Sequence, residues 1–266
     1  QRLYAKFFRA SPWAPIAVSS LDAIASSRQA YRMKNERPVG PLIENWTQPP
    51  LPPSVDLVGR YASVVPFDLK AHSRQLYDLN SSDDAIWDYM PQGPFDSFQA
   101  YHDWMAENAL GTDPMFHTIV NHETGRAEGV ATYLRITPAA GAIEVGFITY
   151  SPALQRMRAG TEAMILMMRQ AFALGYRRYE WKCNALNQPS RRLAMRLGMS
   201  FEGVFRQAAV VKGRNRDTAW YAAIDKDWPN IDSAFTKWLD PANFDAEGMQ
   251  KVSLSSLTAP LLINIG

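Results

Sequence analysis

The chain has 266 residues, of which 47% are apolar and 20% are charged, and its formal net charge is +2. This composition is typical of a folded protein with a sizeable core and excludes a predominantly disordered chain. The net charge is too small to indicate a nucleic-acid or membrane partner by itself, and no apolar run approaches the roughly 18 residues of a membrane span. Cys183 is the only cysteine, which excludes an internal disulfide and favours a reducing compartment.

Residues 1–48 differ in composition from the rest of the chain. The first 34 residues are rich in Arg, Ser and Ala, and Asp22 is their only acid. That composition resembles an organelle transit peptide, with a surface-draped extension as the alternative. We therefore expect a cytoplasmic protein, or an organellar one if the extension is a transit peptide. The Pro-rich residues 49–54 predict a stiff linker to a main domain at 55–240, and residues 241–266 form a tail.

Strand and helix patterns alternate irregularly along the main domain. Alternation predicts strands over 55–67, 115–121, 126–136, 142–150, 177–185, 201–211 and 218–225. Helical spacing predicts helices over 69–80, 95–110, 161–176 and 187–198, and "SAFTKWL" at 233–239 leads into the tail. Asp96 or Ser97 is placed to cap the second helix, and Asn187 to cap the fourth. Hairpins thus flank one strand–helix–strand crossover, which predicts an α+β domain with a mixed, mostly antiparallel twisted sheet and flanking helices.

The turn "SPALQRMRAG" at 151–160 precedes a helix start expected at Thr161. From residue 156 to 216 the chain has about 13 basic and three acidic side chains. A turn before a helix N-terminus offers converging backbone N–H groups to an anion, although the turn could also simply face water. Neither the Walker pattern nor Gly-x-Gly-x-x-Gly is present. The pattern predicts a pyrophosphate held by the backbone, with arginines as outer clamps.

Several segments resemble, in order, the GNAT superfamily of acetyltransferases and specifically its RimJ/RimL-like branch. They are "AIEVGFITYSP", "LQRMRAGTEA", "YEWKCNALN", "NQPSRRLAMRLGMSFEGVFR" and "FEGVFRQAAVVKGRNRDTAWYAAIDKDW". The resemblance covers roughly residues 55–240 and implies the GNAT acyl-CoA N-acyltransferase fold. It also implies an enzyme that transfers acetyl from acetyl-CoA, its cosubstrate, to a primary amine by direct attack. The amine acceptor would be a protein N-terminus or a small molecule.

The resemblance assigns the turn to the pyrophosphate of acetyl-CoA, which the family binds with Gln/Arg-x-x-Gly-x-Gly/Ala. The corresponding residues here are Gln155, Arg156, Met157, Arg158, Ala159 and Gly160, followed by Thr161. Gln155 and Gly160 match the pattern. Arg158 stands at the first glycine, where it excludes any conformation reserved for glycine but keeps the backbone N–H contacts.

The strand before the turn is implied to hold the pantetheine arm. Phe147, Ile148 and Thr149 would pair with it through their backbones, as an added strand would. The N–H of Phe147 or Ile148 would polarise the thioester carbonyl. Asn187 and Ser190 match the family's Asn-x-x-Ser/Ala element and are expected to contact the cofactor as well.

Two side chains are expected to carry the proton transfers. Relatives place a carboxylate at the position of Glu144, where it removes the amine proton through water; a strand residue pointing to solvent is the alternative. Many relatives carry a tyrosine acid where this chain has Ala194, and a Phe where it has Met199. Ser190 is then the nearest substitute acid, unless its hydroxyl only caps the helix.

The family's acceptor pocket maps onto the segment "IWDYMPQGPF". It contains Trp87, Tyr89 and Phe95, and the carboxylates Asp83, Asp84 and Asp88 lie nearby in sequence. Aromatic rings and carboxylates would suit a cationic amine. A loop packed onto the domain by its aromatic residues explains the same sequence equally well.

Other classes of function remain as alternatives. One is a GNAT-like module that binds CoA without turnover, and another is RNA or ribosome association through the basic stretch, which we rank last. Cys183 could form an acyl-enzyme, but its alternation with Trp181 favours a buried hydrophobic residue. The four histidines show no paired ligand spacing, so no metal is expected. We expect no membrane partner and a monomer or homodimer.

Overall fold

The computed structural model describes residues 39–266, so the prediction of a transit peptide lies largely outside the described residues. Residues 47–266 form one compact unit, which is distinct from residues 1–46. Residues 39–46 contain a turn and no helix or strand. The Pro-rich stretch packs on the compact unit: Pro49 and Pro52 are buried, and the Tyr176 hydroxyl donates to the carbonyl of Pro50 at 3.0 Å.

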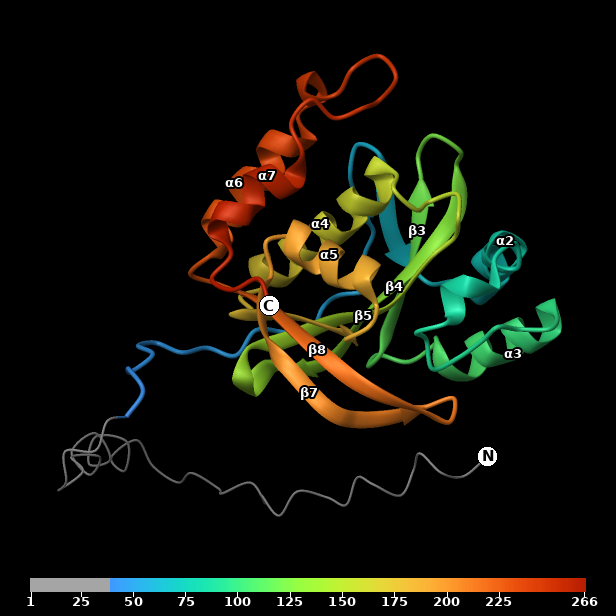
Figure 1. Cartoon of the computed structure of the whole chain (residues 1–266), viewed down its shortest axis with the longest axis horizontal. Coiled ribbons are helices and arrows are strands. Elements are labelled where there is room, and N and C mark those ends of the chain that lie inside the picture. Colours follow the sequence, from blue (N-terminus) through green and yellow to red (C-terminus); the bar gives the residue numbers. More distant parts are fainter. Residues whose placement is uncertain (1–38) are drawn as a thin grey trace. The chain divides into compact units, whose positions relative to one another are not determined.

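An eight-stranded sheet forms the centre of the compact unit, in the order β1-β2-β3-β4-β5-β6-β8-β7 (Figure 1). The strands are β1 (Leu57–Val58), β2 (Ala62–Pro66), β3 (Met115–Asn121), β4 (Arg126–Thr137), β5 (Ala142–Tyr150), β6 (Arg178–Asn184), β7 (Ser200–Val211) and β8 (Arg214–Ile224). Every neighbouring pair is antiparallel except β5 and β6. The crossover helix between β5 and β6 explains this one parallel pair, and the predicted mixed sheet is confirmed.

The helices lie on both faces of the sheet, with α4 and α5 on one face and α2 and α3 on the other (Figure 1). They are α2 (Leu69–Asn80), η1 (Asp84–Trp87), α3 (Phe98–Asn108), η2 (Pro138–Ala140), α4 (Arg158–Ala173), α5 (Gln188–Arg196), α6 (Trp228–Leu239), η3 (Pro241–Asn243), α7 (Leu254–Thr258) and η4 (Ala259–Leu261). Ser97 caps α3 by accepting from the N–H of Ala100 at 3.2 Å, and Asn187 caps α5 by accepting from the N–H of Ser190 at 3.1 Å.

Element boundaries differ from the sequence predictions at several places. The expected strand at 55–67 is divided by a turn into β1 and β2, and β8 begins at Arg214 rather than at residue 218. The helix expected from Thr161 begins at Arg158. Residues 233–239, for which no element was predicted, belong to a helix that begins at Trp228. Pro229 lies in the first turn of that helix, α6, where its missing N–H costs nothing.

Two hydrophobic cores lie on opposite faces of the sheet. The main core packs α4, α5 and α6 against residues such as Ile143 and Val145. It also includes Phe244 and Leu254 from the end of the chain. The second core joins α2 and α3 to β3 and β4 and includes Phe116. Strand residues alternate between faces. Glu144, which lies between Ile143 and Val145, therefore belongs to the face that carries α2 and α3.

The sheet opens between β5 and β6. The two strands pair only over Ala142–Val145 and Arg178–Trp181. Beyond these residues β5 stays paired with β4 alone, and β6 with β8 alone. A bulge in β5 adds to the opening. The register of β5 against β4 shifts between Gly146 and Thr149, and within this stretch Phe147 has a φ of 47°. Among the strands that the structure describes, none pairs with this edge of the second half of β5.

Candidate active site

The loop from β5 to α4 folds tightly and ends in an uncapped helix start. The carbonyl of Ser151 accepts from the N–H groups of Leu154 and Gln155 at 3.0 and 3.1 Å, and the N–H of Met157 donates to Leu154 at 3.2 Å. No described side chain caps α4. The first N–H groups of a helix have no partner within it, and they carry partial positive charge. This helix start, at the end of the free half of β5, is therefore suited to an anion.

Arg158 does not disturb the loop. It is the first residue of α4 and has no positive φ; the left-handed residue of the loop is Arg156, with a φ of 65°. Gly160 is the position that needs a glycine, because a Cβ there would lie 2.9 Å from a ring carbon of Tyr150. The Tyr150 hydroxyl also donates to the carbonyl of Gly160 at 2.7 Å. The arginine at the family's first glycine thus meets no conformation reserved for glycine.

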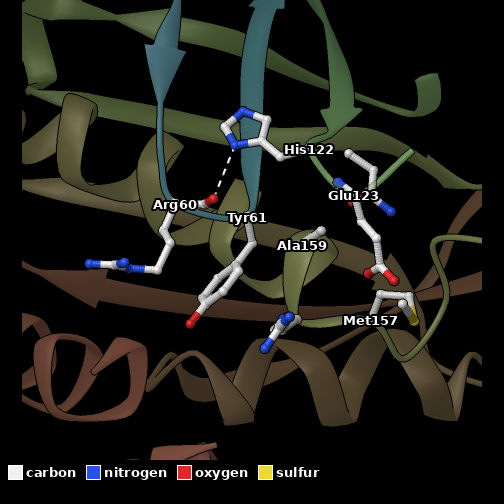
Figure 2. Close-up of a pocket in the computed structure, with 8 residues that line it drawn as sticks. Arg60, Tyr61, His122, Glu123, Met157 and Ala159 are labelled. Atoms are coloured by element: carbon white, nitrogen blue, oxygen red, sulfur yellow. Dashed lines mark hydrogen bonds between the residues drawn. The ribbon is translucent and has the colours of Figure 1, made fainter. Parts of the chain in front are cut away.

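A cavity of about 300 Å³ adjoins the start of α4 (Figure 2). Its lining is Arg60, Tyr61, Asn121, His122, Glu123, Met157, Arg158 and Ala159. The guanidinium of Arg158 lies 4.3 Å from the ring centroid of Tyr61 and 5.5 Å from that of Phe244. His122 Nδ1 lies 3.0 Å from the carbonyl oxygen of Arg60 (Figure 2). Aromatic packing therefore holds a cation in the wall of a cavity beside the helix start.

Ser190 lies where β6 ends and α5 begins, across the opening from β5. The indole Nε1 of Trp181 donates to its Oγ at 3.0 Å, and its backbone N–H donates to Asn187. With the indole as donor to its oxygen, the hydroxyl keeps its own proton for another partner. Cys183 lies nearby and is buried, and burial raises the pKa of its thiol, although a hydrogen bond with Ser190 acts in the opposite direction. This thiol is a poor nucleophile, because the reactive species is the thiolate.

Glu144 lies at the closed end of the opening and is only 3% exposed, so it does not point into solvent. Its two oxygens accept from Nη1 of Arg135 at 2.7 and 2.8 Å. Nζ of Lys182 lies 2.6 Å from Oε2 and also contacts Glu180 at 2.8 Å. Two cations therefore hold this buried carboxylate, whose remaining lone pairs could accept from a water.

The expected acceptor residues lie on the face that carries α2 and α3. Trp87 is 4% exposed and packs edge-on against Phe95 at a centroid distance of 5.3 Å, so both belong to the second core. Tyr89 is more exposed, and its hydroxyl donates to Leu186 at 3.4 Å. Lys212, at the tip of the β7–β8 hairpin, donates to the carbonyl of Trp87 at 2.8 Å. These contacts join the acceptor segment to the β6–α5 junction and to the hairpin.

The three aspartates near this segment are exposed. Asp83 is engaged locally, because its carboxylate accepts from the N–H of Ala85 at 3.0 Å and caps η1.

The sequence patterns did not point to three residues around Glu144, which are Arg135, Lys182 and Trp220. The alternation of Arg178, Glu180 and Lys182 along β6, opposite to the apolar residues of the same strand, was the available signal for Lys182.

Two further findings apply to residues 39–266. No group of three or more His, Cys, Asp or Glu side chains in this range could hold a metal ion. None of the helices in the same range is long and apolar enough to cross a membrane.

Comparisons with known proteins bear on the fold and the family of the chain. The family model for the acetyltransferase (GNAT) domain matches residues 64–200. No curated protein matches the chain. A GCN5-related N-acetyltransferase from Brucella melitensis is 39% identical, and the match covers 82% of this chain and 100% of that one with a TM-score of 0.80. A probable GNAT acetyltransferase from Chromobacterium violaceum is 38% identical, with 73% and 98% covered and a TM-score of 0.69.

More distant structures share the fold alone. The microcin C7 self-immunity acetyltransferase MccE, solved with acetyl-CoA and AMP, is 20% identical over 65% of this chain and 98% of its own, with a TM-score of 0.57. The match to the family model and the identity with the Brucella protein decide the assignment. The chain belongs to the GNAT family of acetyltransferases.

Proposed function

We propose that this protein transfers acetyl from acetyl-CoA to a primary amine by direct attack, as a RimJ/RimL-like member of its family. The observation that carries the proposal is the opening between β5 and β6, which leads to the uncapped start of α4. A free strand edge suits the amide groups of a pantetheine arm. A helix start suits a pyrophosphate. Acetyl-CoA presents both groups in this order.

The cosubstrate would contact two segments of the chain. Phe147, Ile148 and Thr149 on the free edge of β5 would pair with the pantetheine arm. The backbone of residues 155–161 would hold the pyrophosphate, with Asn187 and Ser190 on the opposite side of the opening. The guanidinium of Arg158, held over Tyr61, would act as a cation for the nucleotide end.

The chemistry requires one bond to form, one bond to break and two protons to move. The amine nitrogen forms a bond to the thioester carbon while the C–S bond breaks. A water on Glu144 takes the proton that the amine loses and passes it to the carboxylate. The Ser190 hydroxyl gives a proton to the departing sulfur and regains one from solvent. The backbone N–H of Phe147 or Ile148 stabilises the oxygen that becomes negative. Trp181 supports this role for Ser190, because its indole orients the hydroxyl.

A CoA-binding module without turnover is the second candidate. The double pairing of Glu144 with Arg135 and Lys182 favours it, because both oxygens of this carboxylate are already engaged in structural ion pairs. The absence of a tyrosine at Ala194 points the same way. Ala194 is fully buried in the main core, so the side chain at this position does not face the opening.

An acetylation assay with matched variants separates the two candidates. Thiol release from acetyl-CoA is followed with a panel of peptides and small amines, and the products are identified by mass spectrometry. Glu144→Gln is compared with Glu180→Gln, because both carboxylates contact Nζ of Lys182 and only Glu144 is proposed as the base. We expect kcat to fall by roughly 100-fold or more in Glu144→Gln and by less than about threefold in Glu180→Gln. Acetyl-CoA binding without acetylation of any amine would support the second candidate instead.

A further inference from the structure

Arg216 on β8 is a half-buried cation that no described carboxylate neutralises. Within residues 39–266 its guanidinium has no ion pair and no hydrogen bond. Its charged neighbours are Glu144, Arg135 and the thiol of Cys183. Glu144 is already held by Arg135 and Lys182. Removing a charge from water without a partner is costly, so this arginine requires an explanation.

Strand register places Arg216 on the same face of the sheet as Glu144. Lys182 pairs with Trp220 across β6 and β8, and its Nζ lies 3.9 Å from the centre of the Trp220 ring while it reaches Glu144. Alternate residues of a strand share a face, so Arg216 lies on the side of β8 that carries Trp220. β6 ends at Asn184, opposite Thr218. Arg216 therefore lies just past the end of β6, beside the opening.

A second donor on this face of β8 also has no acceptor. The indole Nε1 of Trp220 is buried and has no hydrogen-bond partner among the described residues. Its ring is fixed between Lys182 on one side and Phe205, which stacks at 4.5 Å. A buried donor without an acceptor is unfavourable, because the hydrogen bond that it made with water is not replaced. Two unmatched donors, Arg216 and Trp220, thus lie on one strand face next to the proposed reaction centre.

The charges on this face add to the same conclusion. The ion-paired cations beside it are Arg135, Arg178 and Lys182, and their carboxylate partners are Glu144, Glu180 and Glu202. Each of these carboxylates is already held by a cation, and Arg216, whose charged neighbours include Glu144, has no ion pair within residues 39–266. A doubly cationic acceptor would be repelled here. An acceptor with a negative group would supply the missing partner.

We propose that the acceptor carries a carboxylate close to its amine and that Arg216 binds this carboxylate. The proposal rests on the proposed acetyl transfer and names the substrate class of the same site. It departs from the expectation of a cationic amine, because the aspartates that suggested one are exposed and Asp83 caps η1. A guanidinium binds a carboxylate through two parallel N–H donors. The carboxylate comes either from a free amino acid or from an acidic side chain next to a peptide N-terminus.

The test compares related acceptors with and without a carboxylate near the amine. One arm uses glycine and glycinamide; the other uses the amidated peptides Ser-Asp-Ala-Ala, Ser-Asn-Ala-Ala and Ser-Lys-Ala-Ala. Wild type is expected to prefer the carboxylate member of one arm by at least about tenfold in kcat/KM, since hydrogen bonds to charged groups contribute about 1.5–3 kcal/mol. The arm that shows the preference identifies the source of the carboxylate.

Arg216→Ala is compared with Arg214→Ala, which removes the same charge from an exposed position two residues away on β8. We expect Arg216→Ala to reduce the preference to about twofold or less, mainly through a higher KM, and Arg214→Ala to keep it. Acetyl-CoA affinity, measured by calorimetry, is expected to stay unchanged in both variants. A failure to bind acetyl-CoA would refute the proposed function itself.

Three results would overturn the carboxylate proposal while acetyl-CoA still binds. The first is a wild-type preference for the amide or lysine acceptors. The second is a carboxylate preference that survives in Arg216→Ala. The third is the absence of turnover with every carboxylate acceptor of the panel.

Discussion

The indole nitrogen of Trp181 donates a hydrogen bond to the hydroxyl oxygen of Ser190, at 3.0 Å. The helix that contains Ser190 is capped by the side chain of Asn187, so the Ser190 hydroxyl does not cap it. This separation of roles allows the hydroxyl to be tested without loss of the cap.

Ser190→Ala is expected to lower kcat by roughly 10- to 100-fold, because removal of a positioned proton donor costs about that much. Acetyl-CoA affinity should change little. Ser190→Thr keeps a hydroxyl and is the matched control, with kcat expected within about fivefold of wild type. Steady-state kinetics at pH 7 measure both. Equal losses in the two variants would indicate a packing effect and contradict the acid role.

Cys183→Ala is expected to keep at least about a third of wild-type kcat, because a buried thiol with a raised pKa is a poor nucleophile. Incubation of the wild-type protein with acetyl-CoA, without an acceptor, should leave its intact mass unchanged. A stable acetyl adduct on Cys183 that an added amine removes would contradict direct attack.

His117 is expected to make stability depend on pH. It is 1% exposed and packs edge-on against Tyr133 at 5.4 Å, and burial lowers its pKa to about 4. The unfolded chain binds a proton near the ordinary value of 6.5, so stability is complete above pH 6.5 and falls as the pH drops towards 4. From pH 7 to pH 5 the loss should be roughly 2 kcal/mol.

Urea unfolding at the two pH values measures this loss. His117→Gln has no imidazole to protonate, so its unfolding free energy should fall by correspondingly less over the same range. The same pH dependence in both proteins would show that other groups are responsible.

Glu162 is expected to stabilise the packing of α4 against the turn between β1 and β2. Its carboxylate is 3% exposed and accepts from the N–H groups of Arg60, Tyr61 and Ala62 at 2.9, 2.5 and 2.9 Å. Glu162→Gln replaces one acceptor oxygen with a donor, so the free energy of unfolding should fall by roughly 1.5–3 kcal/mol. Glu123→Gln, on the exposed cavity wall, should change it by less than about 0.5 kcal/mol. Urea unfolding measures both variants, and equal losses of unfolding free energy would refute this stabilising role of Glu162.

Local patterns in the sequence predicted most of the fold. Alternation and helical spacing placed the strands and helices around the crossover, and Ser97 and Asn187 cap the helices as their positions predicted. The start of α4 was placed three residues late, at Thr161, because no capping side chain marks it. Helix starts without a polar cap leave no local signal.

The surroundings of the candidate site were harder to predict, because they depend on register between strands that lie far apart in sequence. Glu144 was singled out, but its pairing with Lys182 requires β5 and β6 to be parallel and in one register. The orientation of Arg158 depends on Tyr61 and Phe244, about 100 and 90 residues away. Arg216 stands out only because the structure gives it no ion pair or hydrogen bond within residues 39–266.

Calorimetric titration of acetyl-CoA into the purified protein tests the central claim most directly, with ATP as the control anion. We expect saturable binding of acetyl-CoA, no comparable binding of ATP, and an affinity roughly three- to tenfold weaker in Arg158→Ala, since a partly exposed cation contributes about 1 kcal/mol. Absence of heat at millimolar acetyl-CoA, which corresponds to a binding free energy weaker than about −4 kcal/mol, would contradict the assignment of the opening and the start of α4 to this cosubstrate.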